Sequence, residues 1–122
     1  MTWNGTRWSA RGTAPLAVLG DVSMDCTSAS FCMVSSNGVT STWTGAGWRP
    51  PVTVQGFIAA VGCQSAIRCF GTTSGGLFVW DGTQWAQTSM AVGDDLTGQS
   101  FVRCVGTSRC VVAAGAHIWW TS

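Results

Sequence analysis

Short apolar segments alternate with breaks rich in Gly, Ser, Thr and Asp along the chain. Such breaks supply the residues that turns require. No stretch of about twelve residues places apolar positions at i, i+3, i+4 and i+7, and sixteen Gly with neither Glu nor Lys disfavour helix further. The pattern therefore predicts an all-β chain. In its middle part, we expect strands at 57–61, 69–73, 77–80 and 85–91.

A skeleton of two cysteines, a Gly-containing turn and Trp-x4-Trp recurs along the chain. Each cysteine pair encloses five residues, and the leading cysteines lie 37 and 41 residues apart, a period typical of repeat arrays. Segments 43–48 and 80–85 carry the Trp-x4-Trp element of two repeats, whereas the third element stands at 3–8, near the N-terminus. We interpret the chain as one domain of three permuted repeats. They span roughly 15–56, 57–97, and 98–122 together with 1–14.

Four-stranded units of this length are typical of β-propeller blades. Three blades would leave two apolar sheet faces open, because closed propellers have typically about four to eight. We therefore expect two chains to close a six-bladed ring as a homodimer, in which residues 3–14 of one subunit supply the outer strand of the partner's last blade. The alternative is a segment of a longer propeller, or blades that curl differently.

Composition disfavours several classes of partner. The formal net charge is +1, charged residues make up 9% of the chain, and the six Arg are spread along it. Nucleic acid and anionic membrane surfaces are therefore poor partners, since both attract clustered Arg or Lys. The longest apolar run, near 111–120, is too short to cross a bilayer. We expect a soluble domain without membrane insertion, and this chain carries no signal peptide.

The six cysteines predict three local disulfides and no metal site. Structural zinc sites usually contain Cys pairs two to four residues apart, and His117 is the sole histidine. Each bridge would contribute about 2 kcal/mol in the chain-entropy model, and disulfides indicate an extracellular, secreted protein. Reduced thiols in a cytosolic protein are the alternative. The predicted bridges are Cys26–Cys32, Cys63–Cys69 and Cys104–Cys110.

The motif Cys-x-Ser-x3-Cys, then Gly, then Trp-x-Gly-x2-Trp resembles the cysteine-bearing propeller repeats of secreted actinobacterial proteins, over essentially the whole chain. That resemblance implies fold and export more than activity. The element at 80–85 is also similar to the repeats of six-bladed fucose-binding propeller lectins. In those lectins an Arg and a Glu from one blade hold the sugar and a Trp from the next stacks on it. Because this chain has no Glu, only the tryptophans transfer.

Catalysis has little support in the sequence. A glycosidase needs two carboxylates about 5–10 Å apart, and Asp94 with Asp95 sits in a segment typical of a loop. A Ser or Cys nucleophile would need His117 as its base. The turn at 80–85 resembles the Asp box of sialidases, but without its residue between Asp81 and Gly82. We therefore expect a non-enzyme without cofactors, with a sialidase-like hydrolase as the third hypothesis.

Eight Trp in 122 residues are the remaining anomaly. Indole rings pack well between sheets, but they also stack on sugar rings while their N–H donates a hydrogen bond. The leading hypothesis is a lectin-like module that binds a glycan or another small polar ligand, and the alternative is a structural or protein-interaction scaffold. Asn4-Gly5-Thr6 matches a glycosylation sequon but also a turn. The candidate ligand-binding residues are Trp80, Asp81, Gln84, Trp85, Trp3, Asn4, Arg7, Trp8, Trp43 and Trp48.

Overall fold

The computed structural model confirms an all-β chain: no helix occurs among the residues that it describes, and three antiparallel sheets of three or four strands are present. These residues are 2–9, 22–36, 38–54, 58–73, 76–88, 100–106, 108–114 and 117–121. No helix in these ranges has the length and apolar character that a membrane crossing requires.

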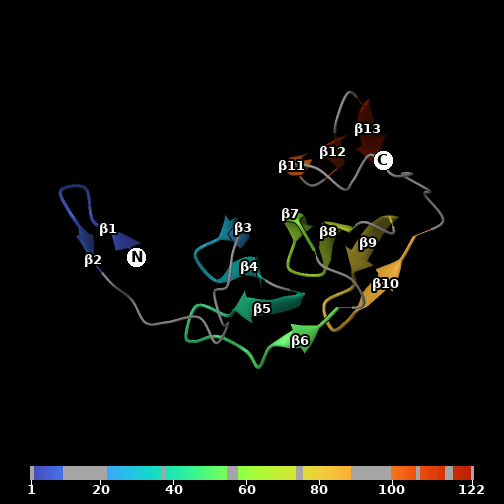
Figure 1. The fold of residues 1–122 in the computed structure, drawn as a ribbon. Helices are drawn as coiled ribbons and strands as arrows, with labels where there is room; N and C mark the ends of the chain where they lie inside the picture. Colours follow the sequence, from blue (N-terminus) through green and yellow to red (C-terminus); the bar gives the residue numbers. More distant parts are fainter. Residues whose placement is uncertain are drawn as a thin grey trace.

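Each repeat forms its own sheet, whose strands follow one another in chain order (Figure 1). The first sheet contains β3 (Val22–Ser28), β4 (Phe31–Ser36), β5 (Val39–Trp43) and β6 (Val52–Thr53). The second contains β7 (Ala60–Ser65), β8 (Arg68–Thr73), β9 (Gly76–Trp80) and β10 (Trp85–Gln87). The third contains β11 (Ser100–Val105), β12 (Arg109–Ala114) and β13 (His117–Thr121). A separate N-terminal hairpin pairs β1 (Thr2–Trp3) with β2 (Trp8–Ser9).

The predicted bounds of the first strand in the second sheet are wrong. The sequence pattern placed it at 57–61, with the cysteines in a loop, whereas β7 begins at Ala60 and continues to Ser65. Cys63 and Cys69 are direct cross-strand partners, and a register shift follows between Cys63 and Ser65. The five residues between the cysteines therefore include strand as well as the tight turn.

All three predicted disulfides are confirmed. Cys26 is bonded to Cys32, Cys63 to Cys69, and Cys104 to Cys110. Each bridge joins the first strand of its sheet to the second at directly opposed positions. In the chain-entropy model, short loops of this kind contribute about 2 kcal/mol each.

The sheets pack face to face through two apolar clusters. The first lies between the first and second sheets and includes Met33 and Val61; the second lies between the second and third sheets and includes Ala60 and Val102. Polar groups connect the first pair of sheets as well, because the Asp25 carboxylate and the Ser23 hydroxyl accept hydrogen bonds from backbone N–H groups of β7. The first strands β3, β7 and β11 lie nearest one another, and the later strands fan outward (Figure 1).

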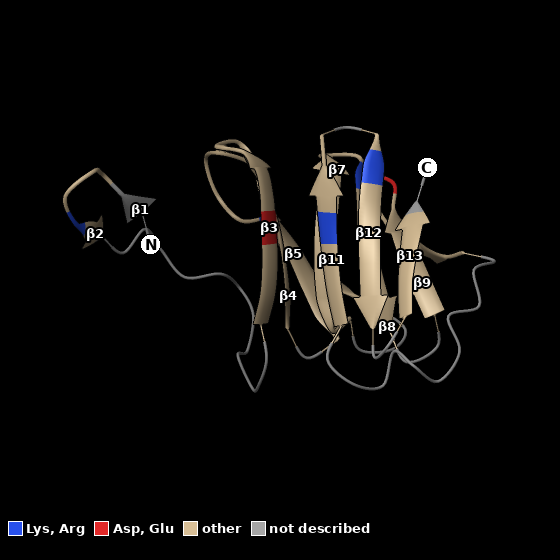
Figure 2. Ribbon diagram, turned by 90° about the horizontal axis from the view of Figure 1, so that it is seen from above, with Lys and Arg blue, Asp and Glu red and all other residues tan. Residues whose placement is uncertain are grey.

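The two ends of this stack carry exposed apolar side chains. On the third sheet, the register aligns Phe101, Ala113 and Ile118 in one row across the three strands. Val111 lies beside Trp120 in a neighbouring row. We call the exposed residues Phe101, Val105, Ile118 and Trp120 the third-sheet face. At the opposite end, Val22 and Met24 of β3 are also exposed and form the first-sheet face. The N-terminal hairpin stands apart from all three sheets in both views (Figures 1 and 2).

Candidate functional site

The Trp-x4-Trp segments at 43–48 and 80–85 are tight hairpin turns whose two indoles lie next to each other, as predicted. Trp43 and Trp48 have ring centroids 5.6 Å apart, and Trp80 and Trp85 have the same separation. Gly82 has a φ of 105°, a left-handed conformation that favours Gly. The turn geometry therefore explains why Gly and the two Trp recur.

One side chain in each turn accepts hydrogen bonds from the residues that follow it. Asp81 Oδ1 accepts from the backbone N–H groups of Thr83 and Gln84 and from the Thr83 hydroxyl. Asn4 does the same in the N-terminal hairpin. The bonds from Gln84 and Thr83 hold the pKa of Asp81 below its ordinary value. The Asp81 carboxylate therefore serves its own turn.

A cleft opens between the first and second sheets. It consists of two adjoining hollows of about 240 and 290 Å³, and Thr42, Arg49, Trp80 and Gly82 line both. The other lining residues of the first hollow are Thr40, Ser41, Pro50, Val52 and Thr83. Those of the second are Ser30, Phe31, Trp43, Thr44, Ala66 and Ile67. We call these two hollows the cleft.

The Trp80 indole N–H has no hydrogen-bond partner, although only 4% of this residue is exposed. Trp43 occupies the equivalent position of the first sheet, since each lies opposite the second cysteine of its repeat. The Trp43 N–H donates to the carbonyl of Ala29 at 3.2 Å. A buried donor without a partner costs about 1–3 kcal/mol. The unpartnered N–H thus marks a place where an acceptor would be bound favourably.

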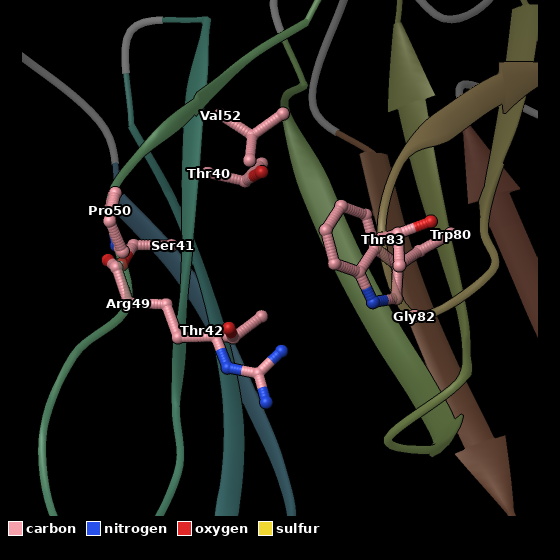
Figure 3. Close-up of a pocket in the computed structure, with 9 residues that line it drawn as sticks. All are labelled: Thr40, Ser41, Thr42, Arg49, Pro50, Val52, Trp80, Gly82 and Thr83. Carbon is pink, nitrogen blue, oxygen red and sulfur yellow. The ribbon is translucent and has the colours of Figure 1, made fainter.

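Arg49 faces Trp80 across the cleft. Figure 3 shows the guanidinium and the indole nitrogen directed toward the same space from opposite walls. Arg49 is exposed, and its side chain makes no hydrogen bond or ion pair with other described residues; its backbone groups bind Ser41 and Thr42. It is the sole charged residue among those that line the two hollows. The site therefore presents donors, a cation and several hydroxyls.

The predicted site residues fall into three groups. Trp80 and Trp43 line the cleft, Trp80 as part of the core and Trp43 half-buried. Trp85 packs against the core and donates its N–H to Thr40 Oγ1 at 2.9 Å, which joins the two sheets. The second group, which lines neither hollow, consists of Trp85 together with Trp48, Asp81 and Gln84. The third group lies on the N-terminal hairpin, apart from the cleft, and consists of Asn4, Arg7, Trp8 and the backbone of Trp3.

Sequence reasoning missed Arg49 and the threonines of the cleft. The available signal was the residue that follows the second Trp of each turn, which is Arg49 in the first repeat, Ala86 in the second and Ser9 in the N-terminal hairpin. A charged residue that occurs in one repeat, where the equivalent positions hold uncharged residues, indicates a role other than maintaining the repeated fold. Thr40 and Thr42 could not be identified, because strand hydroxyls carry no pattern of their own.

The described part of the chain contains no group of three or more His, Cys, Asp or Glu side chains that could hold a metal ion. His117 stacks on Trp119, with ring centroids 5.6 Å apart. Asp94 and Asp95 lie outside the described residues. The charged residues that are coloured in Figure 2, all in the described part of the chain, lie on separate elements.

No protein-family model, no curated protein and no solved structure matches the chain.

Proposed function

We propose that this chain is a secreted, non-catalytic carbohydrate-binding module, and that the cleft holds the sugar. The observation that supports this most strongly is the unpartnered Trp80 N–H, which is buried and directed into the cleft. A sugar hydroxyl or ring oxygen would accept its hydrogen bond. Trp43, half-buried in the cleft wall, would stack on the apolar face of the sugar ring.

The polar lining agrees with this ligand class. Arg49 can donate several hydrogen bonds from a planar group. The Thr42 hydroxyl can both donate and accept, and the Thr83 hydroxyl, which donates to Asp81 Oδ1, can accept. Sugar recognition requires such a mixture next to an aromatic surface, since each sugar ring has hydroxyls at its rim and C–H groups on its faces. The three disulfides agree with secretion.

Replacing Trp80 by Phe tests this site, because an aromatic side chain is kept at this core position while the indole N–H is lost. We expect a sugar identified on a glycan array to bind wild-type protein in the millimolar range or tighter, and the W80F variant to bind at least about tenfold more weakly, since a lost hydrogen bond of about 1.5 kcal/mol corresponds to that factor. Calorimetric titration measures both.

Trp119→Phe is the matched control, because Trp119 lies on the third sheet and outside the cleft. It should bind like the wild type. If no sugar binds at millimolar concentration, or if W80F binds as well as W119F, the proposed site is wrong.

The architecture that fits this module is a half-propeller that pairs with a second copy. Two positions in the repeats support it. The first position lies three residues before the leading cysteine of each repeat and holds Ser23, Ala60 and Phe101. Ser23 and Ala60 contact the next sheet, whereas Phe101 is exposed. The second position lies two residues before the same cysteine and holds Met24, Val61 and Val102. Val61 and Val102 are fully buried against the preceding sheet, whereas Met24 is exposed. A second copy would cover both ends and close six sheets into a ring.

The N-terminal hairpin would add the fourth strand to the partner's third sheet. Thr121 lies opposite Cys110, as Trp80 lies opposite Cys69. Because Trp85 pairs with Trp80 in the second sheet, Trp8 should pair with Thr121 of the partner subunit. Trp8 pairs with Trp3 in the hairpin and is 63% exposed in a single chain.

A protein-interaction scaffold is the second candidate function. The exposed third-sheet face favours it, since large apolar patches often mark protein-protein contacts. The glycan array and the mass of the protein in solution separate the two candidates: a single chain that binds no sugar and leaves the third-sheet face uncovered would support the scaffold.

A further inference from the structure

We infer that the sugar bound in the cleft carries an anionic oxygen group, as a uronic acid does, and that Arg49 recognises this group. The inference rests on the proposed function and names the class of its ligand. Its starting point is the balance of donors and acceptors in the cleft.

Two groups that lack a partner in the cleft, the Trp80 indole N–H and the Arg49 guanidinium, are donors and not acceptors. The Trp80 indole can only donate its N–H, and a guanidinium has five N–H donors and no acceptor. A neutral hydroxyl satisfies one donor while its own hydrogen needs an acceptor elsewhere. A carboxylate accepts on both oxygens and has no hydrogen to place. An acceptor-only group therefore matches these two donors best.

Charge leads to the same class. Arg49 is the sole charged residue that lines the two hollows, so no lining carboxylate neutralises it. Asp81 lies in the adjacent turn, but its Oδ1 is occupied by three hydrogen bonds from Thr83 and Gln84. A guanidinium binds a carboxylate through two parallel hydrogen bonds, which gives orientation as well as affinity.

The hydroxyls and Trp43 determine that the anion is part of a sugar and not a free ion. Thr42 and Thr83 flank the two donors, and Trp43 adds an aromatic wall in the second hollow. A small inorganic anion would leave these surfaces unused. A pyranose ring with a carboxylate at one end reaches the donors and the wall together. In the other repeats Ala86 and Ser9 replace Arg49, so we assign one such site to each chain.

The test compares methyl β-glucuronide with its neutral amide and with methyl glucoside, by calorimetric titration of the full chain. We expect the glucuronide to bind at least about tenfold more tightly than the amide and its affinity to fall as salt rises. A glucose sulfate added as a fourth ligand distinguishes carboxylate from sulfate as the source of the anionic group. Arg49→Gln should remove the preference for charged ligands, so that the glucuronide and its amide bind with equal affinity.

Arg68→Gln is the matched control. It removes the same charge, but Arg68 begins β8 of the second sheet, lines neither hollow and lies over Phe70, a member of the cluster between the second and third sheets. It should retain the preference. If wild-type protein binds the acid and the amide equally, or if R68Q loses as much of the preference as R49Q, the inference is wrong while the proposed function stands. If no sugar binds, both are wrong.

Discussion

Replacing Phe101 by Asp should separate the proposed two-chain ring into single chains of 12.8 kDa. Phe101 is 57% exposed in one chain, so the variant should fold, but in the ring its side chain would be covered by the partner's first sheet. An unpaired charge buried at such an interface costs about 3–5 kcal/mol, and two-fold symmetry places it at two equivalent interfaces. Native mass spectrometry at micromolar concentration measures the outcome.

Ile67→Asp controls for a new charge on the surface. Ile67 is exposed to a similar extent, at 69%, but lies in the turn between β7 and β8 and on neither end face. Its mass should remain that of the wild type, twice 12.8 kDa. A wild-type chain that is monomeric at these concentrations would contradict the shared ring, and so would an F101D variant that remains paired.

Replacing Gly62 by Ala should lower the free energy of unfolding by about 1–3 kcal/mol, the usual cost of overpacking. Gly62 lies where β7 meets β11. A Cβ at this position would come within 2.6 Å of Val102 Cγ1 and 3.0 Å of the Val102 carbonyl. Val102 is fully buried and its backbone is part of the ladder of β11, so neither strand can move freely. Urea unfolding measures the change as a lower midpoint with an unchanged slope.

Gly47→Ala is the control for the Gly-to-Ala change itself. A Cβ at Gly47 meets no atom within 4 Å, so the variant should be neutral or slightly more stable, because Ala restricts the unfolded chain. Equal unfolding midpoints for the two variants would show that the second and third sheets do not pack as closely as described.

Local chemistry made the sheets and disulfides predictable. Cys63 and Cys69 share the same spacing as the other pairs, and Asp81-Gly82 with flanking tryptophans fits one type of hairpin turn. The start of β7 was not predictable, because nothing in the sequence distinguishes a cysteine at the end of a strand from one inside it. Direct pairing of Cys63 with Cys69 decides that point.

The cleft could be predicted only in part. Trp80 and Trp43 were found because they recur, although recurrence by itself indicates packing as much as binding. Their surroundings differ in a way that the repeat does not reveal: the Trp43 N–H donates to the Ala29 carbonyl in a turn of its own sheet, whereas the Trp80 N–H has no partner. Arg49 reaches the cleft because the first sheet packs against the second. Contacts of this kind depend on tertiary packing, on which the repeat pattern carries no information.

The most direct test of the central claim is the indole N–H signal of Trp80 in protein labelled with ¹⁵N-tryptophan. Eight indole signals are expected, and the one that disappears in W80F identifies Trp80. On titration with methyl β-glucuronide, the Trp80 signal should shift the most, because its unpartnered N–H acquires an acceptor, while the Trp119 signal should stay in place. A Trp80 signal that does not move at saturating sugar, or a largest shift in the N-terminal hairpin, would show that the cleft is not the sugar site.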